Sequence, residues 1–377
     1  MGIERKQFFS SLPKKLTYES VDTVKIGNRL IGKGQPTFII AELGANHRGK
    51  IETALKAIEL VAEFGADAVK FQHLTHDKIA ADTIVYDEWN GKDIGALSSF
   101  YKSAELPYEW TDRLVAHAKK HNIMFLSTPF DFEAVDVLEK AKVPAYKIAS
   151  YELTDDLLLE YIAKTGKPII ISTGMAYLEE VAHAVRIIQE AGNNKIIILH
   201  CISMYPPKSF EDLNLRAITT LQQAFKLPIG YSDHSKPPYL AAPIVAVTLG
   251  ACVIEKHFTD ENSGGSNDDA NSLAPQEFKR TVEEIRNTEK SLSHSGIKQP
   301  VSYKDHKGDE VFDRWARRSL YAKTDIPVGT VVKKDMLISL RPWGGIAPKD
   351  LNIILGKKVR LSIKKRSPIT WDDFLDS

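Results

Sequence analysis

The chain contains 377 residues, of which 43% are hydrophobic and 26% are charged. This composition is typical of a globular protein with a sizeable core, and it excludes a single small module, a fibrous protein and a largely disordered chain. The net charge of +1 argues against a general affinity for nucleic acid.

The two cysteines, Cys201 and Cys252, each lie in an apolar run. We therefore predict buried, unbridged thiols, as in proteins of a reducing compartment. The N-terminus lacks an apolar signal segment, and no stretch approaches the roughly 18 apolar residues of a membrane span. We expect a cytoplasmic protein that does not contact membranes.

Residues 1–36 are predicted to form an N-terminal tail and a hairpin. Short apolar runs flank Gly27-Asn28, which is a favoured pair for a tight hairpin turn. We expect this hairpin to have a structural role and to plug the closed end of the domain that follows.

Residues 37–293 alternate short apolar runs with stretches of helical spacing, the pattern of repeated βα units. Eight runs are predicted strands: 37–43, 67–72, 123–128, 145–150, 168–173, 195–201, 228–234 and 251–257. This count and length predict a (β/α)8 TIM barrel, with a doubly wound open sheet as the alternative. Polar residues end most of the runs, and a barrel would bring them together at one mouth.

The last two predicted strands end in Ser232-Asp233-His234 and Glu255-Lys256-His257. Two imidazoles from neighbouring strands could hold one divalent ion and leave positions open for water and substrate. The alternative is that His234 and His257 are hydrogen-bonded core residues.

Lys70 and Lys147 each lie within an apolar run at a strand end. A lysine in such a position needs an anion or a wet cavity, because an unpaired buried charge is costly. Hydroxyl groups at other strand ends could complete a cradle for a phosphate and a carboxylate: Thr128, Ser150, Ser172 and Ser232. The alternatives are salt bridges to Glu42, Glu152 or Glu255, and a Schiff-base lysine.

Residues 294–310 are polar and are predicted to be a linker, and residues 311–377 a small β domain. The second region has 14 Lys and Arg against 7 Asp and Glu, a local charge of +7 that leaves −6 for residues 1–310. A basic domain of this kind could be a solvated surface, or a lid that brings charge to an anionic ligand or to a neighbouring subunit.

An ordered series of motifs gives the chain a family resemblance from about residue 23 onward. The motifs are AELGANH, VKFQ, STPF, YKIASYE, ISTGM, HCISMYP, GYSDH, EKHFT and SLRP. They resemble the sialic acid (nonulosonic acid) synthase family, and in particular the spore-coat polysaccharide synthases within it. The resemblance implies a barrel followed by an antifreeze-like (SAF) domain, in a domain-swapped homodimer where that domain covers the partner's barrel mouth.

The resemblance also implies a reaction. Such enzymes condense phosphoenolpyruvate with an open-chain N-acetylamino sugar, release phosphate, and serve sialic acid or surface polysaccharide biosynthesis. The implied cofactor is a divalent metal, Mn²⁺ first, with Mg²⁺ or Co²⁺ as alternatives. A Schiff-base pyruvate aldolase on the same barrel and a non-catalytic carbohydrate-binding protein are the rival functions.

Residue roles follow from the resemblance position by position. The implied metal ligands are His234 and His257. The implied donor-side groups are Lys70, Thr128 and Lys147 for the carboxylate and Ser150, Ser172 and Ser232 for the phosphate. The implied sugar-side groups are Glu42, Gln72, Ser203, Tyr205, Glu255, Asp268 and, from the tail domain, Arg341. Glu42, Lys70, Lys147 and Glu255 are the expected catalytic residues, and either Glu255 or Asp268 could transfer a proton.

The chain departs from the family pattern on the sugar side. Ser203 replaces the usual Asn, Asn267-Asp268-Asp269 replaces Pro-Asp-His, and the tail loop reads RPWGG instead of RPG. These changes leave the identity of the acceptor sugar open and do not affect the expected donor half.

Overall fold

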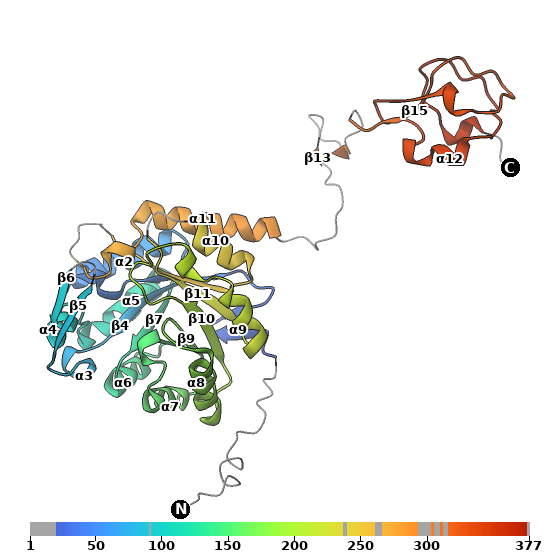
Figure 1. Cartoon of the computed structure of the whole chain (residues 1–377). Coiled ribbons are helices and arrows are strands. Elements are labelled where there is room, and N and C mark those ends of the chain that lie inside the picture. Colours follow the sequence, from blue (N-terminus) through green and yellow to red (C-terminus); the bar gives the residue numbers. More distant parts are fainter. Residues whose placement is uncertain are drawn as a thin grey trace, which may run out of the picture. The chain divides into compact units, whose positions relative to one another are not determined.

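The computed structural model describes residues 20–89, 92–236, 240–260, 266–292, 303–304, 310–311 and 316–374. The chain divides into two compact units, Met1–Ser293 and His294–Ser377 (Figure 1). The predicted tail before residue 20 and most of the predicted linker lie outside the described residues. No helix in the described part of the chain has the length and apolarity of a bilayer-spanning segment.

Eight parallel strands of the first unit form a closed barrel in chain order. They are β3 (Phe38–Glu42), β4 (Ala68–His73), β7 (Met124–Pro129), β8 (Tyr146–Ile148), β9 (Ile169–Ser172), β10 (Ile196–Cys201), β11 (Ile229–Asp233) and β12 (Val253–His257). The last strand pairs with the first, with Glu255 opposite Ile40, so the sheet closes. The predicted TIM barrel is confirmed and the open sheet is wrong.

Helices cover the outside of the barrel (Figure 1). They are α2 (Ile51–Glu63), α5 (Thr111–Lys120), α6 (Phe132–Lys140), α7 (Asp156–Ala163), α8 (Leu178–Glu190), α9 (Ala217–Phe225), α10 (Ala241–Thr248) and α11 (Pro275–Leu292). In α2 the buried residues Ala54, Ala57, Ile58 and Val61 recur at helical spacing, so one face packs onto the sheet. Gly65, with a φ of +85°, follows the helix in the left-handed conformation that ends many helices.

The strands β1 (Thr23–Ile26) and β2 (Arg29–Gly32) form an antiparallel hairpin around Gly27-Asn28. Its buried side chains, Val24, Ile26 and Ile31, belong to one apolar cluster with barrel residues such as Phe38 and Ile170. Because Phe38 begins its strand, the cluster lies at the amino end of the barrel. The hairpin therefore closes that end and leaves the opposite end open.

An excursion between β4 and α5 was not predicted. It contains α3 (His76–Ile79), the antiparallel strands β5 (Ile84–Trp89) and β6 (Lys92–Ala96), and α4 (Leu97–Lys102). Ile84 is 60% exposed and Tyr86 is 94% exposed, so the described part of β5 lacks the buried apolar face that a sequence pattern could reveal. The excursion follows the carboxyl end of β4, where the cavity of the barrel opens.

The second unit is a small domain with its own apolar core, built around β15 (Ser319–Ala322), β16 (Leu337–Leu340) and α12 (Leu351–Ile354). The two strands form an antiparallel ladder, and other described segments of this unit pair through single bridges such as Ile326 with Ile363. The predicted linker contains part of a two-residue strand pair, Tyr303–Lys304 with Glu310–Val311.

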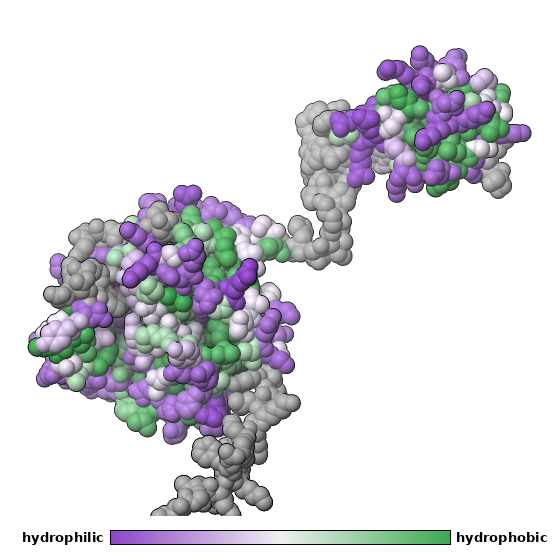
Figure 2. Space-filling view, viewed as in Figure 1, coloured by the Kyte–Doolittle hydropathy of each residue, from purple (hydrophilic) through white to green (hydrophobic). Residues whose placement is uncertain are grey.

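Apolar and hydrophilic residues are interspersed on the visible face of the second unit (Figure 2). Its exposed large apolar side chains are Val328, Val331, Ile338, Trp343, Ile353, Leu361 and Trp371. The surface of this unit therefore combines a basic charge with scattered apolar groups.

Candidate active site

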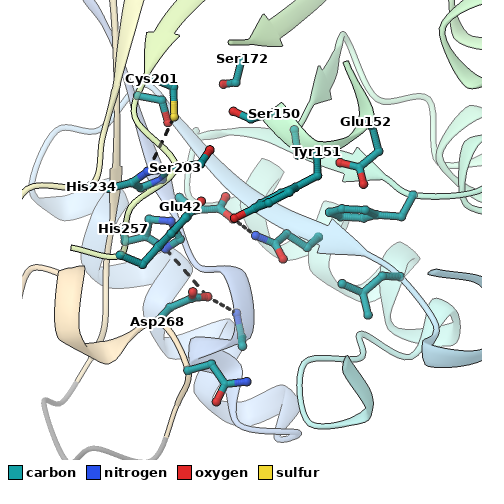
Figure 3. A pocket seen from close by; sticks show the side chains of 18 of the residues that line it. Glu42, Ser150, Tyr151, Glu152, Ser172, Cys201, Ser203, His234, His257 and Asp268 are labelled. Atoms are coloured by element: carbon teal, nitrogen blue, oxygen red, sulfur yellow. Dashed lines mark hydrogen bonds and ion pairs between the residues drawn. The ribbon is translucent and has the colours of Figure 1, made fainter. Parts of the chain in front are cut away.

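A cavity of about 480 Å³ opens at the carboxyl end of the barrel strands (Figure 3). It brings together most of the predicted site residues: Glu42, Lys70, Gln72, Lys147, Ser150, Ser172, Ser203, Tyr205, Ser232, His234, Glu255, His257 and Asp268. Thr128 lies just behind this surface, where its hydroxyl accepts a hydrogen bond from Lys70 Nζ at 3.3 Å. Arg341 belongs to the second unit.

Two lysines and two glutamates form the charged floor of the cavity. Lys70 Nζ lies 2.6 Å from Glu42 Oε2, and both Lys70 and Lys147 approach Glu255 Oε1, at 3.8 and 3.5 Å. The side chains of Lys70 and Lys147 are 4% and 3% exposed. Both lysines form salt bridges, which is one of the alternatives predicted from the sequence. Glu255 therefore links the two lysines in one cluster.

The two lysines differ in their pKa values although they share a partner. Burial lowers the pKa of Lys70, but the Glu255 and Glu42 carboxylates outweigh it and the net pKa is raised. Burial dominates at Lys147, where the pKa is lowered. Lys70 is therefore a fixed cation, whereas Lys147 loses its proton more readily.

Two serine hydroxyls, of Ser150 and Ser203, lie close to Gly174, and Ser172 lies two residues before that glycine in β9. The Gly174 amide donates to Ser150 Oγ at 2.9 Å, and a Cβ at Gly174 would lie only 2.2 Å from Ser203 Oγ. Ser172 Oγ and Ser203 Oγ are buried and have no hydrogen-bond partner within the described residues. Buried hydroxyls without partners are costly, and an anionic oxygen in the cavity would satisfy them.

His234 and His257 lie together at the ends of strands β11 and β12, with ring centroids 5.3 Å apart. The Nδ1 atom of His234 donates to the Ile202 carbonyl at 2.9 Å, so its Nε2 atom keeps a free lone pair. His257 Nδ1 is buried without a hydrogen-bond partner in the described part of the chain, 3.9 Å from Asp268 Oδ2. Imidazole nitrogens and carboxylate oxygens are donor atoms that suit a divalent transition metal, and these two histidines and Asp268 offer both kinds.

Asp268 is held in place by the loop that follows β3. The amide of Ala45 donates to Asp268 Oδ2 at 2.9 Å. Gly44 has a φ of +48°, and a Cβ there would lie 2.2 Å from the same oxygen. Only glycine leaves room for this carboxylate to reach the cavity.

The sugar-side residues lie between the charged floor and the opening. Gln72 Nε2 donates to Glu42 Oε1 at 2.7 Å, and the Tyr205 ring packs 4.0 Å from the ring of His234. Ala45, Asp87, Tyr101, Tyr151, Cys201 and Asn267 also line the cavity and were not predicted as site residues.

One side of the cavity is an apolar wall, formed by Leu74, Ile94, Leu97, Phe100 and Phe130. Three of these side chains come from β6 and α4 of the excursion. No motif in the sequence could have revealed the wall, because only the fold brings these residues to the barrel mouth.

Glu152 is a further cavity residue that the sequence suggested only as a salt-bridge partner (Figure 3). Its Oε2 atom is buried and makes no hydrogen bond within the described residues. Burial raises the pKa of Glu152 to about 7. This carboxyl group therefore changes charge near neutral pH.

Replacement of Glu152 by Gln should stabilise the protein more at pH 8 than at pH 5. The folded pKa is about 7 against a reference of 4.5, so wild-type stability falls as pH rises through this interval. The difference in unfolding free energy should reach on the order of 2–3 kcal/mol at pH 8. Thermal unfolding of both proteins at the two pH values measures it. Gln at the exposed Glu179 is the control, and a stability gain independent of pH would contradict the assignment.

A closed βα barrel whose single open mouth gathers cations, unpaired hydroxyls and two imidazoles is the architecture of a barrel enzyme that binds an anionic substrate. The NeuB family model matches residues 57–297, and the SAF domain model matches residues 317–375. The chain belongs to the NeuB family, which confirms the resemblance predicted from the motifs.

Individual relatives match over nearly the whole chain. The spore coat polysaccharide biosynthesis protein SpsE of Bacillus subtilis is 38% identical over 366 residues, 93% of this chain and 97% of that protein. A pseudaminic acid synthase of Campylobacter jejuni is 38% identical over 354 residues, 93% of this chain and all of that protein. The crystal structure of the N-acetylneuraminic acid synthetase from Leptospira borgpetersenii, in complex with citrate, is 35% identical with a TM-score of 0.67, covering 74% of this chain and 93% of that one.

Proposed function

We propose that this protein condenses phosphoenolpyruvate with an open-chain N-acetylamino sugar to give a sialic-acid-like nonulosonic acid and phosphate, for surface or coat polysaccharide biosynthesis. The observation that carries the proposal is the cluster of Lys70, Lys147 and the unpaired serine hydroxyls beside two imidazoles. This set matches a donor that has both a carboxylate and a phosphate.

In the proposed reaction, C3 of phosphoenolpyruvate forms a bond to the aldehyde carbon of the sugar. Water then adds to C2, and the bond between C2 and the bridging oxygen breaks to release phosphate. Lys70 and Lys147 hold the donor carboxylate, while Ser150, Ser172 and Ser232 hold its phosphate, so that positioning and charge stabilisation lower the barrier. A divalent ion, Mn²⁺ or alternatively Mg²⁺ or Co²⁺, would be held by His234 and His257 and would polarise the aldehyde oxygen.

The remaining polar groups serve the acceptor. Gln72 and Tyr205 line the cavity, and together with Glu42 of the charged floor they can bind sugar hydroxyls. Glu255 and Asp268 both line the cavity and are the candidates for proton transfer. Ser203 offers a hydroxyl where the family usually presents an amide, which suits a different acceptor substituent.

The apolar wall bears on the class of acceptor. Lys70 and Lys147 are the only Lys or Arg residues among the described residues that line the cavity, and Asp87 adds negative charge there. A phosphate at the apolar wall would contact apolar groups without a cation from the barrel, and Arg341 is assigned to the N-acetyl group of the acceptor. We therefore propose a neutral acceptor whose far end is apolar, such as a deoxy or additionally N-acylated sugar.

The test is phosphate release by the purified full-length protein with phosphoenolpyruvate, Mn²⁺ and a panel of neutral and 6-phosphorylated N-acetylamino sugars. Release should require both substrates and should be faster with neutral sugars. No release with any sugar would contradict the synthase, whereas preference for the phosphates would contradict only the acceptor class. Borohydride trapping of a covalent pyruvate adduct would instead favour the Schiff-base aldolase.

We also propose that the working unit is a cytoplasmic, domain-swapped homodimer in which the second unit of one chain covers the barrel mouth of its partner. The basic charge and exposed apolar groups of that unit support such a covering role over a barrel of net negative charge. The loop after β16 carries the exposed Arg341. Ser319 Oγ braces this loop by accepting the amides of Gly344 and Gly345, both at 3.1 Å.

Replacement of Arg341 by Ala should raise the KM for the sugar at least tenfold and change the KM for phosphoenolpyruvate less than twofold. A single charged hydrogen bond to the acceptor amide is worth about 1.5–3 kcal/mol. Steady-state kinetics with each substrate varied in turn measures the effect. Ala at the exposed Arg317 is the control within the same unit, and an equal rise in both KM values would contradict the assignment of Arg341 to the sugar.

A further inference from the structure

The outer surface of the barrel carries a second group of potential metal ligands, none of which lines the cavity at the mouth. Helices α2 and α5 pack against each other in the outer layer (Figure 1). Glu59 lies on α2, His117 lies in the last turn of α5, and His121 caps that helix. Histidines four residues apart on a helix lie on one face, so both imidazoles can reach the same ion.

The distances among these three side chains are those of a nearly assembled site. Glu59 Oε1 lies 2.9 Å from His117 Nε2 and 3.8 Å from His121 Nε2. One ligand atom from each residue lies within 4.8 Å of the other two. A tetrahedral zinc ion with bonds of about 2.0–2.2 Å places its ligand atoms roughly 3.3–3.5 Å apart, so small side-chain rotations suffice.

The second histidine has no other evident use. The ring of His121 packs 4.7 Å from that of His117 at an angle of 43°, and its Nε2 atom is buried without a hydrogen-bond partner in the described part of the chain. Glu59 already has a hydrogen-bond partner in His117, at 2.9 Å, and does not need His121 for this purpose. The unsatisfied ring nitrogen therefore points to a third participant between the two helices.

We propose that Glu59, His117 and His121 form a binding site for a zinc-class divalent ion that clamps α2 to α5. Two imidazole nitrogens and one carboxylate oxygen favour Zn²⁺, Ni²⁺ or Cu²⁺ over Mg²⁺ or Mn²⁺, which prefer oxygen ligands. The Glu59 side chain is 50% exposed, so water could supply a fourth ligand. This site is independent of the proposed reaction, because none of its residues lines the cavity at the mouth.

The test compares zinc binding by the full-length wild-type protein and the His121→Ala variant, by competition with a chromophoric chelator. The wild type should bind one zinc ion per chain more than the variant, or bind that ion at least tenfold more tightly. Zinc should also raise the unfolding temperature of the wild type and have a smaller effect on the variant. Equal stoichiometry and affinity would overturn the proposal.

Three further variants make the result specific. His183→Ala removes a histidine that also contacts a carboxylate, Asp156, at 2.8 Å, but that has no second imidazole beside it, so zinc binding should be unchanged. His121→Gln keeps a polar helix end and guards against a folding defect, and it should bind zinc as weakly as the Ala variant. His257→Ala should keep the outer ion, and loss of that ion in this variant would assign the zinc to the mouth instead.

Discussion

Replacement of Lys70 by Met is expected to lower kcat/KM for phosphoenolpyruvate by about 10²- to 10³-fold, the usual loss when one charge-stabilising group is removed from an active site. Lys70 lies within 4 Å of both Glu42 and Glu255. The Met side chain has similar volume but carries no charge, so the donor carboxylate would face two glutamates without the fixed cation. Phosphate release at varied phosphoenolpyruvate concentrations measures the loss.

A matched variant separates this effect from a general loss of stability. Lys167 also forms an ion pair, with Glu139 at 2.6 Å, but it precedes β9 at the amino end of the barrel. Lys167→Met should therefore retain wild-type kinetics. If both variants lose activity in parallel with their unfolding temperatures, Lys70 is a structural residue and not a donor ligand.

Replacement of His257 by Ala should remove bound manganese and phosphate release together, with activity falling at least 10²-fold. The variant removes one of two neighbouring imidazoles and leaves His234 alone beside Asp268. Metal content after gel filtration and phosphate release in the same samples measure both quantities. Treatment of the wild type with a chelator should have the same result, and added Mn²⁺ should restore only the wild type.

The control for the metal assignment is His183→Ala, which removes a partly exposed histidine of α8. It should keep both manganese and activity. A His257→Ala protein that loses activity but keeps its manganese would place the ion elsewhere, and one that keeps both would remove the metal from the proposed reaction.

The barrel could be predicted because its strands are buried on both faces and therefore read as continuous apolar runs, as in Ile196–Cys201. Topology alone then brings the ends of the strands together. The inward-facing residues follow from the alternation of side chains, since Lys70 and Gln72 are two positions apart and both line the cavity. On the neighbouring strand β7, Ser127 points away from the cavity, and its Oγ atom forms a hydrogen bond with His73 Nδ1 at 2.6 Å.

The parts that could not be predicted depend on tertiary packing. Part of the apolar wall comes from β6 and the six-residue helix α4, which lie outside the repeated βα pattern, so nothing in the sequence marks Leu97 and Phe100 as cavity residues. Glu152 is one acidic residue among 49, and only its burial gives it a pKa of about 7. The pairing of Glu59 with two histidines requires knowing that α2 and α5 are neighbours.

The excursion between β4 and α5 means that donor binding and acceptor preference depend on different parts of the chain. Lysines and serines that would bind the donor lie on or directly after barrel strands, whereas Ile94, Leu97 and Phe100 belong to a segment that contributes no strand to the barrel. Acceptor preference can therefore diverge between relatives through this one segment while the shared chemistry stays intact. Replacement of residues 74–104 by the same segment of a relative with a different acceptor should therefore transfer that relative's acceptor preference.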